Sequence, residues 1–544
     1  MSDAPSIPLG LMTSICRQLP YQADPLALYE QVTCPNQPSL LLESATVTTR
    51  QHLQSILLIR AALEFECYGP QVTITALTSN GEALLPWLTS ELAAMPCQLL
   101  EQTDTQLRYE FHTPAPNLDE DSRLRAVSNI EPLRRVLKGI KPCGDNSHPM
   151  ALLLGGVFAY DYVATFESLP DVATGDNQCP DYIFYLAETT LVIDHQQRTT
   201  VLLGSLFGDA EHHPYQSQLQ RYLDQLTEQC QTPMAEPTPA VMAPLPAFPA
   251  ADVTVEPSAK DFAQRVELLQ QHIQAGDIFQ AVAARSFKLP CDNALAAYRV
   301  LKQTNPSPYL FFLRSKTFEL FGASPESALK YTAATNQVEL YPIAVTRPRG
   351  RTANGQLDTE LDNRLELELR LDQKETAEHI MLVDLARNDL AKIATPGSRH
   401  VANLMTIDRY AHVMHLVSRV TAQLAADLDA LDAYRACMNM GTLVGAPKLS
   451  AARLLRQLEQ QRRGSYGGAL GYLNGAGDMD TCIVIRSAFV QHGYAIVQAG
   501  AGIVHASQPS AEVAETEHKA KAVILAIQQA NTPLKEPAHV TDCA

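Results

Sequence analysis

Short apolar runs bounded by turn residues predict β-strands in the N-terminal half of the chain. Residues 39–42 and 200–206 are such runs, and residues 71–77 alternate between apolar and polar positions. Alternation with a period of two is typical of a strand with one buried face. The glycines at 155 and 156 predict a turn that leads into an aromatic segment, and we expect its rings to pack in the core.

An amphipathic helix is predicted near the middle of the chain. Ser258 and Asp261 have the spacing of a helix-capping pair, and Gly276 is typical of a residue just past a helix end. Between them, one apolar face repeats at helical spacing and consists of Phe262, Val266, Leu269 and Ile273.

Strands and helices alternate through the remainder. Apolar and polar positions alternate at 278–289, 317–331 and 338–350. Few helical segments separate these strands, so we expect antiparallel neighbours. There follow an acidic helical stretch at 358–393, a strand at 481–490, a glycine-rich turn at 498–504 and a last helix at about 510–531. The pattern predicts an α+β fold.

The clearest boundary in the chain is the window 231–257, which contains seven prolines. Proline is disfavoured in helix interiors and central strands, so this window is predicted to be an extended connector. We therefore expect an N-terminal region at 1–230, a second region at 258–531 and a flexible tail at 532–544.

Composition narrows the class of protein. The 544 residues are 46% apolar and carry a formal charge of -17, so a large core is expected and a basic face for nucleic acid or an anionic membrane is not. Eleven scattered cysteines without metal-ligand spacing favour reduced thiols. No apolar run is long enough to span a bilayer, so we expect a cytoplasmic protein with no membrane contact.

Two pairs of glutamates have the spacing of neighbours on a helix face. Glu375 and Glu378 form one pair, and Glu512 and Glu515 form the other. Carboxylates are ligands that Mg²⁺ accepts, together with water and substrate oxygens. Solvated helix faces in an acidic chain show the same spacing, and the spacing alone leaves both interpretations open.

Other polar residues stand in unusual surroundings. Glu326 follows a proline between strand segments, where shielding from water favours a protonated general acid. Arg486 lies among apolar residues and needs a carboxylate, from the protein or from a ligand. Gly500 and Gly502 suit a turn whose amides bind an anion. Lys519 follows Glu515 by four residues, and His415 lies on an apolar face, where a structural role is as compatible with the sequence as a chemical one.

Many separate motifs, in order, give the chain a family likeness. They are NPSPYLFF, GASPES, YPIAVTRPRG, KETAEHIMLVDLARNDLAKI, GTLVGAPK, RRGSYGGALGY, DTCIVIRSA, QAGAGIV and AEVAETEHKA, with LLLESA and GGVFAYDYVATFE in the N-terminal region. Together they resemble the large-subunit family of anthranilate synthases, which are chorismate-utilising enzymes. The resemblance covers nearly the whole chain. It implies a large twisted antiparallel sheet core of two packed sheets, with helices outside and the N-terminal region packed on a chorismate-binding core.

The resemblance also implies a reaction and the residues that carry it. Chorismate and ammonia give anthranilate and pyruvate, the first step of tryptophan biosynthesis, with Mg²⁺ held by Glu375, Glu378, Glu512 and Glu515. Glu326 is then the acid for the departing hydroxyl, and His415 assists pyruvate elimination. The pocket is expected to contain Gln280, Val345, Thr346, Thr442, Tyr466, Arg486, Gly500, Gly502 and Lys519.

Two positions favour ammonia over other nucleophiles. Ala344 stands where related aminodeoxychorismate synthases place a nucleophilic lysine, and Gln280 stands where water-using relatives place a lysine base. Val345 replaces the glycine usual in the family. The alternatives left open are an enzyme that stops at the aminated intermediate, aminodeoxyisochorismate, or a catalytically impaired regulator that binds tryptophan.

Partners and regulation follow from the same resemblance. No glutaminase half is recognised in the chain, so a separate glutamine amidotransferase subunit is expected, in a hetero-oligomer such as a heterotetramer. Tryptophan is expected to inhibit through a pocket that consists of Glu43, Ser44, Arg50, Pro308, Tyr309 and Leu310.

Overall fold

The computed structural model describes eight stretches of the chain. They are residues 10–44, 53–112, 118–143, 147–208, 214–233, 252–352, 356–409 and 413–532, with only the backbone at 344–346, 374 and 413. Most of the predicted connector, residues 533–544 of the predicted tail, and Arg50 lie outside the described residues.

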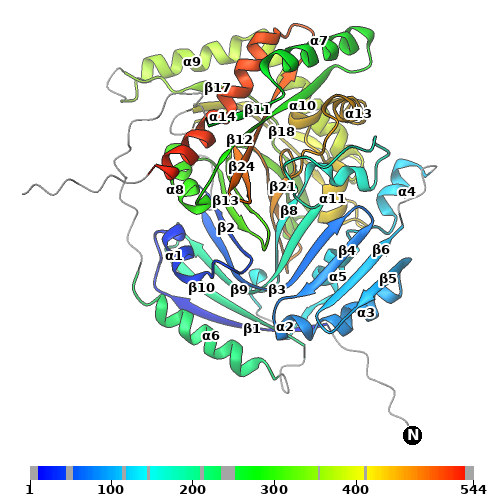
Figure 1. The fold of residues 1–544 in the computed structure, drawn as a ribbon, viewed down its shortest axis with the longest axis vertical. Coiled ribbons are helices and arrows are strands. Elements are labelled where there is room, and N and C mark those ends of the chain that lie inside the picture. The colour runs from blue at the N-terminus through cyan, green and yellow to red at the C-terminus, as the bar shows by residue number, and fades with distance from the viewer. Residues whose placement is uncertain are drawn as a thin grey trace, which may run out of the picture.

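Strands dominate the middle of the molecule, and helices surround them (Figure 1). All 24 strands of the described part join one hydrogen-bonded network, almost entirely antiparallel. In the N-terminal region the strands are β1 Leu11–Leu19, β2 Ser39–Glu43, β3 Gln54–Tyr68, β4 Gln71–Ala76, β5 Cys97–Gln102, β6 Gln106–Phe111, β7 Lys141–Pro142, β8 Leu153–Phe158, β9 Tyr182–Asp194 and β10 Thr199–Phe207. In the second region they are β11 Thr254–Glu256, β12 Gln280–Pro290, β13 Tyr309–Arg314, β14 Glu319–Ser324, β15 Ser327–Thr332, β16 Gln337–Leu340, β17 Ile343–Pro348, β18 His400–Arg409, β19 Val413–Gln423, β20 Gly445–Ala446, β21 Ala469–Asn474, β22 Met479–Ile483, β23 Ser487–Gln491 and β24 Tyr494–Ile503. The predicted α+β class with a large antiparallel sheet is confirmed.

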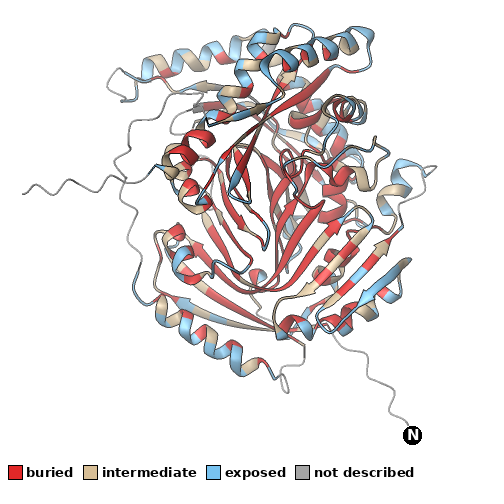
Figure 2. Cartoon of the chain, viewed as in Figure 1, coloured by how far each residue is buried: buried red, intermediate tan, exposed pale blue. Residues whose placement is uncertain are grey.

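Most helices pack on the outside of this network and expose their polar faces, whereas α11 is buried along nearly its whole length (Figure 2). In the N-terminal region they are α1 Pro25–Val32, α2 Ser79–Glu82, α3 Leu85–Ala93, α4 Glu120–Arg125, α5 Glu131–Gly139 and α6 Gln216–Gln229, with 3-10 turns at Pro149–Ala151 and Tyr160–Thr165. In the second region they are α7 Ala259–Ala275, α8 Ala294–Thr304, α9 Thr359–Leu371, α10 Gln373–Ala391, α11 Ala430–Cys437, α12 Gly441–Val444, α13 Lys448–Glu459 and α14 Pro509–Asn531, with a 3-10 turn at Ala333–Thr335. No helix of the described ranges is long and apolar enough to cross a membrane.

The two predicted regions share strand pairs. Strand β2 pairs with β13, which places Glu43 opposite Leu310, and β8 pairs with β21, which places Val157 opposite Leu470. The apolar core therefore continues from one region into the other, as the buried strands in Figure 2 show. The division of the chain into domains stays a prediction.

Local sequence signals correctly predicted the positions of two helices. Helix α7 begins after Ser258, whose hydroxyl accepts a hydrogen bond from the Asp261 amide at 3.2 Å, and it ends at Gly276, whose φ of 85° suits glycine. Helix α14 covers the predicted last helix. The acidic stretch is not one helix but two, because Asp372 ends α9 and caps α10 by accepting the Glu375 amide at 3.1 Å.

Three sequence predictions of local structure are wrong. The predicted turn at 498–504 lies mostly within strand β24, where the Gly500 and Gly502 positions pair with β12. The predicted strand at 481–490 is two strands, β22 and β23, which separate at Arg486 with a φ of 50°. The predicted glycine turn at 155–156 lies inside β8, although the aromatic side chains that follow are buried as expected. Pairing with neighbouring strands outweighs the turn preference of glycine in β8 and β24.

Candidate active site

A cavity of about 340 Å³, including its open mouth, lies where strands β14 to β17 meet helices α10 and α12; we call it the Glu326 cavity. Its lining consists of Glu326, Ser327, Leu340, Tyr341, Pro342, Leu382, Leu385, Ala386, Asp389, Met440, Gly441 and Thr442. Apolar side chains form much of the wall, and few polar groups point into it. Such a setting strengthens the electrostatic effect of each polar group.

Glu326 is placed by the bend between β14 and β15. Its backbone is held on both sides, because its carbonyl accepts the Ile483 amide at 3.0 Å and its own amide donates to Ser324 Oγ at 3.3 Å. Burial raises the pKa of the carboxyl group to about 8, and Thr442, Lys519 and Arg486 offset part of that effect. At neutral pH the group is therefore mostly protonated and can donate a proton.

Two cations lie next to this acid. Arg486 is half-buried, donates through Nη1 to the Lys519 carbonyl at 3.2 Å, and forms no ion pair with a carboxylate of the described residues. Lys519 Nζ contacts Glu515 Oε1 at 2.6 Å and the Gly500 carbonyl at 2.9 Å. The guanidinium fork of Arg486 is suited to a carboxylate of a ligand.

Gly500 and Gly502 lie in strand β24 and do not form the predicted anion-binding turn. Because they have no side chain, they leave room for the neighbouring groups of the site. A Cβ atom at Gly502 would lie 2.6 Å from Gln280 Nε2, and one at Gly500 would lie 2.9 Å from the Tyr466 hydroxyl. Both approaches are closer than real Cβ atoms allow, so a side chain at Gly500 would press on the backbone of Ala283 and one at Gly502 would displace the Gln280 side chain. Gln280 Oε1 is buried and has no hydrogen-bond partner, which leaves an acceptor for a ligand.

His415 and Thr346 are cross-strand partners. Strands β17 and β19 pair so that Thr346 lies opposite His415 and Val345 lies opposite Leu416. His415 is also opposite Asp408 of β18, and its side chain is buried. The side chains of Val345 and Thr346 lie outside the described atoms, so the effect of the valine on the pocket stays a prediction.

The four glutamates lie on α10 and α14, as predicted. Glu375 Oε1 accepts from Arg347 Nη2 at 2.8 Å, whereas Glu375 Oε2 is buried without a hydrogen-bond partner. Glu378 is half-buried, Glu512 is buried and Glu515 is exposed. Within the described part of the chain, no three His, Cys, Asp or Glu side chains come together as a metal cluster.

A model of the chorismate binding enzyme family matches residues 95–525. The chain belongs to the chorismate-binding enzyme family. It is 52% identical to anthranilate synthase component 1 of Vibrio cholerae, over 94% of this chain and 96% of that protein. It is also 52% identical to anthranilate synthase component 1 of Salmonella typhimurium, again over 94% and 96%. The crystal structure of anthranilate synthase component I from Streptococcus pneumoniae matches with a TM-score of 0.65 and 29% identity, over 92% of this chain and 97% of that one.

The residues around α10 fulfil some of the requirements for binding a divalent cation. Mg²⁺ commonly takes only one or two protein carboxylates, with water and substrate oxygens filling an octahedron. The unpartnered Glu375 Oε2 is a donor of that kind. The full set of four glutamates as ligands is not assembled among the described side chains and stays a prediction.

Most of the residues predicted to form an inhibitor pocket lie at or next to the junction of β2 and β13. The Glu43 carboxylate accepts from Tyr298 Oη at 2.6 Å and from Lys302 Nζ at 2.5 Å, and Tyr309 Oη donates to Asp480 Oδ1 at 3.1 Å. Ser44 and Pro308 adjoin these strand ends, and Leu310 is buried opposite Glu43. Five of the six predicted residues are thus near one another, and Arg50 lies outside the described residues.

Sequence reasoning missed a buried arginine behind the site. Arg463 donates to the Leu443 carbonyl at 2.8 Å and the Val282 carbonyl at 2.6 Å, and it pairs with Glu459. Its guanidinium also lies over the Tyr160 ring at 4.6 Å. Arg463 therefore ties the Thr442 segment to strand β12. The motif RRGSYGGALGY contained it, but only the fold shows that it is buried.

A buried ion pair was also missed. Lys448 donates to Asp389, which lines the Glu326 cavity, and to the Cys437 carbonyl at 2.7 Å. Burial raises the pKa of Asp389, and Lys448 opposes this shift. The motifs GTLVGAPK and VDLARNDL contain the two residues, and their separation of 59 positions hid the contact.

Proposed function

We propose that the protein is the chorismate-using component of an anthranilate synthase, a lyase that converts chorismate and ammonia to anthranilate, pyruvate and water. The observation that carries the proposal is the 52% identity, over nearly the full chain, to relatives named anthranilate synthase component 1. The protonated Glu326 beside Arg486 and Lys519 supports it chemically.

Glu326 is the general acid of this proposal. Hydroxide is a poor leaving group, so the ring hydroxyl must receive a proton as ammonia adds to the ring. A carboxyl group with a pKa of about 8 carries that proton at neutral pH, and the hydroxyl leaves as water. His415, buried beside Thr346 on paired strands, then assists removal of the ring proton as pyruvate departs.

The substrate carboxylates meet cationic and amide groups of the site. Arg486 takes one carboxylate through its fork, and Lys519 adds a second charge from α14. Tyr466 and the Gln280 amide close the wall next to Gly500 and Gly502, where a larger residue would intrude. Thr442, whose buried hydroxyl also lowers the pKa of Glu326, supplies one more hydrogen-bonding group.

Mg²⁺ is the expected cofactor, and Glu375, Glu378, Glu512 and Glu515 are the residues proposed to hold it. When bound, the cation neutralises and orients the ring carboxylate. Arg347, which holds Glu375 Oε1, fixes the direction of the remaining oxygen.

Ammonia is proposed to come from a separate glutamine amidotransferase subunit, because the relatives are named as component 1 of an anthranilate synthase. A hetero-oligomer such as a heterotetramer follows from that proposal. Ala344 and Gln280 support ammonia as the nucleophile, since neither side chain can act as an amine nucleophile or as a base for water.

Feedback inhibition by tryptophan is proposed through the predicted inhibitor pocket at the junction of β2 and β13, which we call the Glu43 pocket. A carboxylate already surrounded by Tyr298 and Lys302 offers a site for the ammonium group of an amino acid, and the apolar Leu310 offers a surface for its ring. Because β13 leads into β14 and Glu326, a ligand at this junction lies on the same sheet as the general acid.

The decisive experiment uses the purified chain with chorismate, Mg²⁺ and an ammonium salt at mildly alkaline pH. Anthranilate fluorescence and pyruvate are followed together, for the natural chain and for Val345→Gly. Equimolar anthranilate and pyruvate from the natural chain are expected, with loss of both in Glu326→Gln.

Other outcomes would replace the proposal. Consumption of chorismate without pyruvate identifies an enzyme that stops at the aminated intermediate. Turnover by Val345→Gly alone identifies a chain whose catalysis the valine has impaired. An absence of chorismate consumption by both forms contradicts the enzyme assignment.

A further inference from the structure

A second, larger cavity lies on the other side of the Lys448–Asp389 ion pair. Asp389 lines the Glu326 cavity, whereas Lys448 lines a cavity of about 860 Å³, including its open mouth. We call the second one the Arg435 cavity. Its walls come from α4 and the segment after Tyr160–Thr165 in the N-terminal region, and from the end of α10, α11 and the start of α13 in the second region.

Four cations line the Arg435 cavity, and three of them are neutralised by carboxylates. The pairs are Arg123 with Glu167 at 3.1 Å, Lys392 with Glu120 at 2.7 Å, and Lys448 with Asp389. Arg435 is the one of the four that forms no ion pair among the described residues, although its charge opposes the rise in the pKa of the Glu167 carboxyl group.

Arg435 is buried, with 4% of its surface exposed. Its Nη1 donates to the Leu124 carbonyl at 3.2 Å, its guanidinium lies over the Phe166 ring at 5.1 Å, and its Nε has no hydrogen-bond partner. Among the described residues no Asp or Glu forms an ion pair with it. A buried cation without an ion-pair partner is unfavourable, so the arrangement suits a ligand that brings an anionic group.

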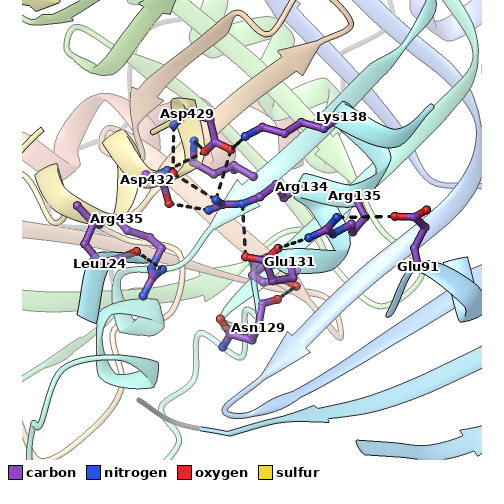
Figure 3. Close-up of polar contacts among 12 residues, drawn as sticks. Glu91, Leu124, Asn129, Glu131, Arg134, Arg135, Lys138, Asp429, Asp432 and Arg435 are labelled. Carbon is purple, nitrogen blue, oxygen red and sulfur yellow. Dashed lines mark hydrogen bonds and ion pairs between the residues drawn. The ribbon is translucent and has the colours of Figure 1, made fainter. Parts of the chain in front are cut away.

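The nearest acidic side chain on its own helix is already engaged. Figure 3 shows Arg134 reaching Asp432 from α5, with Arg435 turned away toward Leu124. Arg134 Nη2 contacts Asp432 Oδ1 at 2.6 Å, and Nη1 contacts Oδ2 at 3.2 Å. Asp432 is thereby held by another arginine, and Arg435 lines the cavity without a carboxylate in direct contact among the described residues.

Three carboxylates, Glu120, Asp121 and Glu167, also line the cavity, and the remaining wall is apolar. Leu124, Phe166, Met438 and Leu449 line the cavity, and Leu449 is 41% exposed at its edge. Apolar surface with a few convergent polar groups is typical of small-molecule sites, and each of the three wall carboxylates is already paired with a lysine or an arginine. We propose that the Arg435 cavity is a second ligand site, which takes a small carboxylic acid with a ring-sized apolar body, its carboxylate on Arg435 and its body on Phe166 and Leu449. The proposal does not depend on the reaction proposed above.

The test measures binding of benzoate, as a probe, to the full chain by ligand-observed NMR and calorimetry. Arg435→Met keeps the packing over Phe166 and removes the charge, and Leu449→Glu places a repelling carboxylate at an exposed position. Both are expected to weaken benzoate binding at least about tenfold, the usual scale for removing one partner of a buried charge pair. Arg221→Met, on the exposed face of α6, is the matched control and is expected to bind as the natural chain does.

Arg486→Gln separates this site from the candidate active site. Benzoate binding retained in Arg486→Gln and lost in Leu449→Glu supports the proposal, even if Arg435→Met fails to fold. Binding that is lost only in Arg486→Gln, binding unaffected by both cavity variants, or no binding to the natural chain overturns it.

Discussion

Gly502 lies directly against the side-chain amide of Gln280, so that a Cβ atom at position 502 would be 2.6 Å from Nε2. The two residues belong to the paired strands β24 and β12, where Gly502 is in register with Val282. Gln280 is two residues before Val282 on the same strand and is therefore the diagonal neighbour on the same face. The absence of a side chain at 502 gives the Gln280 amide its place in the site.

Gly502→Ala is therefore expected to displace the Gln280 amide. The added methyl group should cost about 1–3 kcal/mol of stability, as overpacking usually does. The shifted wall should lower kcat/KM for chorismate by roughly tenfold to a hundredfold. Thermal denaturation and steady-state kinetics measure the two effects.

The double variant Gly502→Ala/Gln280→Ala is the control for this explanation. It removes the group that the methyl strikes, so stability should recover while activity does not. A Gly502→Ala enzyme with unchanged kinetics would contradict the role of this contact.

The pH dependence of activity should follow Glu326. Its carboxyl group has a pKa of about 8, and the protonated form is the acid, so activity should fall about tenfold per unit above pH 8. The measurement is kcat/KM for chorismate at a fixed concentration of free ammonia, because ammonia itself titrates in this range. Glu326→Gln should lose roughly a hundredfold to ten-thousandfold. A rate that keeps rising through pH 9 would argue against the assignment.

The stability of the fold should decrease with rising pH because of Glu326, whereas an ordinary ion-paired carboxylate makes stability increase with rising pH. The pKa of Glu326 is about 8 in the folded chain, against an ordinary value of 4.5. Between these values the folded chain binds one more proton than the unfolded chain, so stability falls as the pH rises. Glu326→Gln should therefore gain about 1.4 kcal/mol per pH unit relative to the natural chain over this window. Urea denaturation at pH 5, 7 and 9 tests this, and a constant difference would refute it.

Arg463→Met should destabilise the fold by about 3–5 kcal/mol, because it leaves Glu459 and two carbonyl groups without their buried partner. Arg463→Met/Glu459→Leu should recover much of that loss, since it removes the unpaired charge as well. Denaturation midpoints of the two variants decide between a charge effect and a packing effect. Equal losses in both would show that packing alone is responsible.

Tryptophan binding should respond in opposite directions to two substitutions in the Glu43 pocket. Glu43→Gln removes the anion that receives the ligand ammonium group and should weaken binding at least about tenfold. Lys302→Met removes the protein cation that now occupies the carboxylate at 2.5 Å, and it should strengthen binding. Calorimetry with tryptophan measures both. Weaker binding in Lys302→Met would indicate that the lysine contacts the ligand instead.

Local patterns predicted the parts of the structure that local forces decide. The capped helix after Ser258 and the strands at 39–42, 71–77 and 200–206 all form where expected. The predictions failed where a segment lies between neighbours in the sheet. The stretch at 498–504 carries glycines typical of a turn, yet pairing with β12 extends it, and Arg486 interrupts a strand that its apolar surroundings favour.

In the candidate site, too, some features were predictable from the sequence and others were not. The family resemblance selected Glu326, Thr442, Arg486 and Lys519, and the fold brings them together. The contacts that support them were not predictable, because their partners are distant along the chain. Lys448 with Asp389 is one such contact, and Arg463 with Val282 is another.

By itself, the sequence determined the fold class, the family and the identities of the groups that can do the chemistry, because motif residues and local propensities are written along the chain. The tertiary structure alone decided how deeply those groups are buried and which partners they meet. Burial gives Glu326 its raised pKa, and the packing around Arg435 leaves it without an ion pair among the described residues. The local pattern around Glu326 predicted its shielding from water, but Thr442, Arg486 and Lys519, which face it, come from distant segments that no local pattern identifies as its neighbours.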